Sequence, residues 1–129
     1  MSRDPHRLRA FVLADDLVVD AYRVTACLPA AERFGLQSQI RRGAVSVPAN
    51  LVEGCARRSE HYLHFIGIAI SSASEVRYLL GLAVRLGFAS ESDGQRLTVG
   101  YSRLIRSLQA LVTSFNSRDA RGPMPEAPK

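Results

Sequence analysis

Three histidines and two cysteines are the side chains best suited to bind a metal or attack a substrate. His61 and His64 stand three residues apart, but no third or fourth metal ligand follows at a suitable spacing. No histidine occurs three positions after a glutamate, so the Glu-x-x-His pairs of di-iron bundles are absent, as are nucleophile elbows and phosphate-binding loops. Cys27 and Cys55 form no C-x-x-C pair. We therefore expect no metal, no cofactor and no catalytic residue, and a protein that is not an enzyme.

Arginine offers a different chemistry, because its guanidinium group forms paired hydrogen bonds with phosphate. Lys129 is the single lysine among 17 basic residues, and the net charge is +5. Two arginine-rich stretches are candidates for RNA or DNA binding, and their residues are Arg41, Arg42, Arg57, Arg58, Arg96, Arg103 and Arg106. Few aromatic residues lie near them in the sequence, so we expect salt-dependent phosphate contacts without base stacking. GC-rich codon usage, or a charged face that keeps the protein in solution, would also account for this abundance of arginine.

A polar set surrounds Pro48 in a segment with helical periodicity. It comprises Gln39, Arg41, Arg42, Ser46, Asn50 and Glu53, with Glu75 in the following helix. In one interpretation Arg41 or Arg42 pairs with Glu53 or Glu75 and fixes the register of the helices, while Asn50 bonds carbonyls freed by Pro48. In the other, the same edge binds a ligand or a partner. The sequence leaves both open.

Four helices must position these residues, because apolar side chains recur at steps of three and four along the chain. The pattern predicts helices over residues 4–27, 36–58 and 59–86 and a fourth from residue 90, with Ser59 and Ser90 as caps. Pro48 is expected to bend the second helix or to split it in two. Leu97, Tyr101, Leu104 and Leu108 form a regular seam on the fourth. The predicted fold is an all-α, up-and-down antiparallel four-helix bundle with a proline-kinked second helix.

Apolar residues beyond one stripe per helix predict self-association. The third helix offers two apolar sides, and Leu13 and Leu17 lie off the main stripe of the first. Because surplus apolar surface of this kind usually marks a protein contact, we expect a homo-oligomer.

The segment around Pro48 also resembles a known family. The run QIRRGAVSVPANLVEG from Gln39 to Gly54, preceded by Glu32-Arg33-Phe34-Gly35-Leu36, is similar to the signature of four-helix-bundle proteins encoded in intervening sequences of bacterial 23S ribosomal RNA genes. Gly43 departs from that signature, which usually has alanine there. The resemblance implies a ring of five protomers. It also implies a nucleic-acid-processing partner, since relatives include accessory proteins that work with a reverse transcriptase and its RNA.

The amino-acid composition indicates the domain organisation and the location of the protein. Residues 1–117 fit one bundle domain, and residues 118–129, rich in proline, are expected to form a disordered tail. No apolar run is long enough for a membrane span, and two scattered cysteines indicate free thiols and a cytoplasmic protein. We expect a non-enzymatic, homo-oligomeric scaffold with an Arg-rich surface as a candidate for binding RNA or DNA. The alternative is a purely structural or protein-interaction oligomer with no nucleic-acid role.

Overall fold

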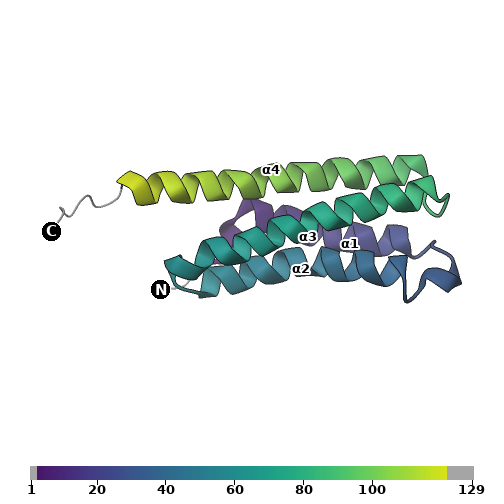
Figure 1. The fold of residues 1–129 in the computed structure, drawn as a ribbon, viewed down its shortest axis with the longest axis horizontal. Coiled ribbons are helices and arrows are strands. Elements are labelled where there is room, and N and C mark those ends of the chain that lie inside the picture. The colour runs from purple at the N-terminus through teal and green to yellow at the C-terminus, as the bar shows by residue number, and fades with distance from the viewer. Residues whose placement is uncertain (1–2, 122–129) are drawn as a thin grey trace.

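The computed structural model describes residues 3–121, with side chains up to Arg118. All regular structure in this range is helical: η1 (Pro5–Arg7), α1 (Arg9–Thr25), η2 (Ala30–Glu32), α2 (Leu36–Ala56), α3 (Ser59–Arg85) and α4 (Glu91–Arg121). Figure 1 shows the four α-helices as rods lying side by side. Neighbours along the chain pack antiparallel, and α1 also packs on α4, so the four helices close into a bundle. The predicted all-α four-helix bundle is confirmed.

The core lies along the stripes that the periodicity marks. Leu97, Tyr101, Leu104 and Leu108 of α4 are all fully buried, which confirms that seam. Leu17 of α1 is also buried, because its side chain packs against Gly100 of α4, where an added Cβ would lie 2.7 Å from its Cδ2 atom. This leucine therefore belongs to the core and not to surplus surface.

Pro48 lies buried inside α2, which continues through it as a single helix from Leu36 to Ala56. Of the two outcomes expected at Pro48, a bend or a split, the split does not occur. Proline removes one helical hydrogen bond, but α2 packs on both α1 and α3, and this packing holds the helix together across the missing bond. The Asn50 side chain donates to the carbonyl oxygen of Ser46 at 2.8 Å, and not to that of Ala44, which Pro48 deprives of its partner.

The helix ends differ from the prediction in two places. The N-terminal segment is not one helix from residue 4, because the Asp4 side chain caps the short turn η1 and Leu8 is extended before α1 begins. Ser59 does not cap α3, since its hydroxyl accepts a hydrogen bond from Arg3 instead. Ser90 does cap α4, as its Oγ accepts from the Asp93 backbone N–H at 3.0 Å. After α3, Gly87 adopts φ 77°, a left-handed conformation that ends helices.

α4 continues to Arg121, four residues beyond the expected domain end at Ser117. Residues 118–121 therefore form its last turn, while the rest of the predicted tail lies outside the described residues. Among the described helices, α3 is the one long and apolar enough to cross a membrane. A helix in the core of a bundle meets the same criterion, and α3 packs between α2 and α4.

Candidate functional site

The polar residues around Pro48 divide between two neighbouring helices. Ser46 Oγ lies 2.8 Å from Ser72 Oγ of α3, and Asn50 Nδ2 donates to Ser46 Oγ at 3.0 Å. These three side chains form hydrogen bonds with one another at the half-buried contact between α2 and α3. Ser46 and Asn50 therefore contribute to the packing of α2 on α3 through Ser72, a residue that the sequence did not indicate.

The ion pairs predicted within this set do not form. Glu53 pairs with Arg57, one turn later on the same helix. Arg42 and Glu75 make no hydrogen bond or ion pair with any other described residue, and Gln39 is exposed. Arg42 does not reach Glu53 along their shared edge, because the two residues lie about 16 Å apart along the axis of α2. Glu53 pairs instead with Arg57 at the favourable spacing of four residues.

Arg41 reaches α1 instead. Its Nε donates to Thr25 Oγ1 at 2.9 Å, its Nη2 donates to the carbonyl oxygen of Tyr22 at 3.0 Å, and its Cζ lies 4.4 Å from the centroid of the Tyr22 ring. Gln37 adds a bond from Nε2 to the Thr25 carbonyl oxygen at 2.8 Å. These hydrogen-bond acceptors are all uncharged, so the guanidinium is fixed in place while its positive charge is not neutralised by a carboxylate.

The predicted arginine stripe on α4 is reduced by an ion-pair network. Arg96 bonds Asp20 of α1 at 2.9 Å and Asp93 at 2.7 Å. The hydrogen bond from Arg96 lowers the pKa of the Asp93 carboxyl. Arg96 therefore joins α4 to α1, and its charge is balanced by two acids. Arg58, Arg103 and Arg106 are exposed and make no hydrogen bond or ion pair with other described residues.

A groove combines several of these residues at the end of the bundle where α2 begins. We call it the Arg groove, and it has a volume of about 530 Å³. Its lining residues come from α1, the η2 connection and α2: Tyr22, Arg33, Phe34, Gln37, Ser38, Arg41, Arg42, Val45 and Ser46. Three arginines line it and no acid does. Phe34 is 89% exposed, and the Cζ of Arg33 lies 6.0 Å from its ring centroid.

Sequence reasoning missed six members of this groove: Tyr22, Arg33, Phe34, Gln37, Ser38 and Val45. It also predicted few aromatic rings near the arginines, whereas the fold brings two rings beside them. Tyr22 is distant in sequence, so no local pattern could place it there. The sequence does show Phe34 next to Arg33 in the connection between two helices. It does not show that the Phe34 ring is exposed to solvent.

Metal-binding side chains do not gather in the described part of the chain. No three His, Cys, Asp or Glu side chains lie close enough there to hold a metal ion. Cys27 is exposed and Cys55 is buried, and both are free thiols. Burial raises the pKa of the Cys55 thiol, which keeps it protonated and unreactive.

The fold and the groove together define an all-α antiparallel four-helix bundle with three arginines along one groove. The family model of the 23S rRNA-intervening sequence protein matches residues 6–110, and the chain belongs to this family. A solved structure with the same architecture is that of a protein with unknown function from the S23 ribosomal protein family of Bacteroides thetaiotaomicron. Its TM-score is 0.74, with 19% sequence identity over 81% of this chain and 95% of that chain, which shows a shared fold. No match is found among curated proteins.

Proposed function

We propose that this protein is a non-catalytic, self-associating helical scaffold that binds RNA or DNA through the Arg groove. The observation that carries the proposal is the charge of the groove, since Arg33, Arg41 and Arg42 line it and no carboxylate does. Such a surface favours a polyanion, because phosphate groups bind arginine strongly and release counterions on binding.

The fixed geometry of Arg41 strengthens this proposal. Its bonds to α1 hold the guanidinium beside the Tyr22 ring, so little side-chain freedom is lost when a phosphate binds. The exposed Phe34 ring adds a surface on which an unpaired base can stack. Single-stranded or looped RNA, whose bases are accessible, is therefore the favoured ligand over duplex DNA.

Self-association is supported by the exposed apolar side chains. Six of the nine large exposed ones among the described residues lie on α1, on α2 or in the connection between them: Val12, Val19, Tyr22, Phe34, Val45 and Val52. Tyr22, Phe34 and Val45 line the Arg groove, so a contact that leaves the groove open to RNA would use Val12, Val19 and Val52. The ring of five protomers and a nucleic-acid-processing partner are proposals that come from the family alone. The free thiols agree with a cytoplasmic location.

Fluorescence anisotropy of labelled RNA tests the groove. We expect binding to a stem-loop RNA that weakens steeply between about 50 mM and about 200 mM salt. The double variant Arg33→Gln and Arg42→Gln removes two charges from the groove and should reduce the salt slope by about 2, because each phosphate contact contributes about 1.

The matched control is the double variant Arg103→Gln and Arg106→Gln, which removes the same charge from exposed positions on α4. A smaller loss of affinity in this control supports the Arg groove. An equal or larger loss would move the contact to α4, where the sequence predicted it. The absence of binding at low salt would favour the alternative of a protein-interaction oligomer with no nucleic-acid role.

A further inference from the structure

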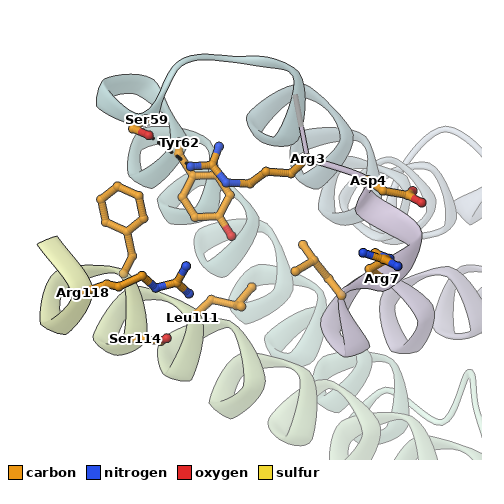
Figure 2. A pocket seen from close by; sticks show the side chains of 10 residues that line it. Arg3, Asp4, Arg7, Ser59, Tyr62, Leu111, Ser114 and Arg118 are labelled. Carbon is orange, nitrogen blue, oxygen red and sulfur yellow. Dashed lines mark hydrogen bonds between the residues drawn. The ribbon is translucent and has the colours of Figure 1, made fainter. Parts of the chain in front are cut away.

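A second cavity lies at the other end of the bundle, where the N-terminal segment, the start of α3 and the end of α4 meet (Figure 2). We call it the end cavity, and its volume is about 1040 Å³. It shares no residue with the Arg groove. The volume is at the upper end of the range for small-molecule sites.

Three guanidinium groups line the end cavity, from Arg3, Arg7 and Arg118. Arg3 is held in place, since its Nη2 donates to Ser59 Oγ at 3.1 Å and its Cζ lies 4.2 Å from the centroid of the Tyr62 ring. Arg7 and Arg118 make no side-chain hydrogen bond or ion pair with other described residues. Both side chains are therefore available to a ligand.

Tyr62 gives the cavity a hydrogen-bonding hydroxyl on a largely buried side chain. Only 5% of this residue is exposed, and its ring lies 5.3 Å from that of Phe115 between centroids. Its hydroxyl makes no hydrogen bond with another described residue, and in Figure 2 it points toward the space beside Leu111 and Arg118. Burial raises the pKa of Tyr62, so the hydroxyl stays protonated at neutral pH and can donate to an anion.

The remaining walls are apolar or of opposite charge. Leu8, Leu111 and Phe115 supply an apolar surface beside the cations. Among the described lining residues Asp4 is the single acid, and its carboxylate already accepts a hydrogen bond from the His6 backbone N–H. Three guanidinium groups against one carboxylate leave two positive charges, which match the charge of a phosphate monoester near neutral pH better than that of a single carboxylate.

We propose that the end cavity binds an aromatic phosphate monoester, with the phosphoryl group between Arg7, Arg118 and the Tyr62 hydroxyl. The ring of the ligand then packs on Leu8, Leu111 and Phe115. A free mononucleotide and the 5′-phosphorylated end of an oligonucleotide share this chemistry. The proposal does not depend on the Arg groove, because the two sites use different residues.

Isothermal titration calorimetry with the full chain tests the proposal with adenosine 5′-monophosphate and phenyl phosphate as probes. We expect saturable binding of at least one, and binding weaker by about tenfold or more for adenosine and for inorganic phosphate alone. Arg118→Gln should weaken binding by about tenfold, whereas Arg103→Gln, on the same helix but outside the cavity, should leave it unchanged.

Tyr62→Phe separates binding from folding. Because the hydroxyl has no partner within the described residues, its removal should leave the melting temperature unchanged while it weakens binding several-fold. A 5′-phosphorylated oligoribonucleotide that binds more tightly than the mononucleotide, and than its 5′-hydroxyl form, identifies a nucleic-acid end as the ligand. No saturable binding of any phosphate monoester at millimolar concentration would overturn the proposal, as would equal losses in Arg118→Gln and Arg103→Gln.

Discussion

At the scale of single residues, the core contains one polar atom whose position carries a cost. The hydroxyl of Tyr101 is buried, and it has no hydrogen-bond partner among the described residues. A buried polar group without a partner loses its bonds to water and gains none in return. Burial also raises the pKa of Tyr101 above its ordinary value of 10.0, because the charged phenolate is disfavoured there.

Tyr101→Phe should therefore stabilise the fold by about 1 kcal/mol in chemical denaturation near neutral pH. The gain should grow above about pH 10, since there the unfolded wild-type chain loses the Tyr101 proton while the folded chain keeps it. The contribution of this proton to the free energy of unfolding of the wild type is therefore fully present below pH 10, and it is lost as the pH rises further. Tyr78→Phe, at an exposed position, is the control and should change little. A loss of stability in Tyr101→Phe would show that the hydroxyl has a partner, such as a buried water.

At the scale of helices, Gly43 sets how closely α2 approaches α3. A Cβ atom on Gly43 would lie 2.6 Å from Cγ2 of Val76, closer than atoms can pack. Val76 itself is fully buried, so its side chain has little room to move. Glycine at this position is therefore explained by close contact between two helices and not by backbone flexibility.

Gly43→Ala should lower the free energy of unfolding by about 1–3 kcal/mol, because overpacking outweighs the gain in helix propensity. The matched control is Gly81→Ala in α3, where an added Cβ meets nothing within 4 Å and should stabilise by up to about 1 kcal/mol. In a double-mutant cycle, Val76→Ala should cost less in the Gly43→Ala background than alone. Additive effects in that cycle would mean that the two positions do not compete for the same space.

At the scale of the whole molecule, the large exposed apolar side chains are distributed unevenly over the four helices. Most large exposed apolar side chains lie on α1, α2 and the connection between them, whereas α3 contributes Tyr78 alone from within its length. Of the residues beyond the main stripe of the third helix, Leu79 is buried. Leu63, Ile70 and Leu82 are half-buried and pack against the core, so part of the expected surplus is used inside the bundle. Any contact between protomers is therefore expected on the α1–α2 side.

Val52→Asp should dissociate the oligomer, as a charge placed in an apolar contact is costly to bury. Val99→Asp is a matched control, because the two valines are 46% and 43% exposed and lie on α2 and α4 respectively. Sedimentation velocity at micromolar concentration measures the mass of each variant. If the wild type sediments as a single 14.1 kDa chain, self-association is absent, and if only Val99→Asp dissociates, the contact lies on α4.

Much of the fold followed from the sequence, because helical periodicity is a local property. The seam from Leu97 to Leu108, the cap at Ser90 and four helices are all consequences of residue types at fixed spacing. The motif around Pro48 was also sufficient to identify the family. The helix boundaries were less well determined by the sequence, because groups distant in the chain also bond to residues at the helix ends. At the start of α3, for example, the Ser59 hydroxyl accepts a hydrogen bond from Arg3.

The partners of the arginines were decided only by the tertiary structure. A long, flexible side chain selects among groups that several helices bring within reach, and no spacing along one helix specifies which of them lies nearest. Arg96 thus pairs with Asp20 of α1, Arg41 with Tyr22 and Thr25, and Arg42 stays without an acid. The sequence determined that the protein is a basic helical bundle. Which of its positive charges remain available to a ligand depended on how the four helices pack.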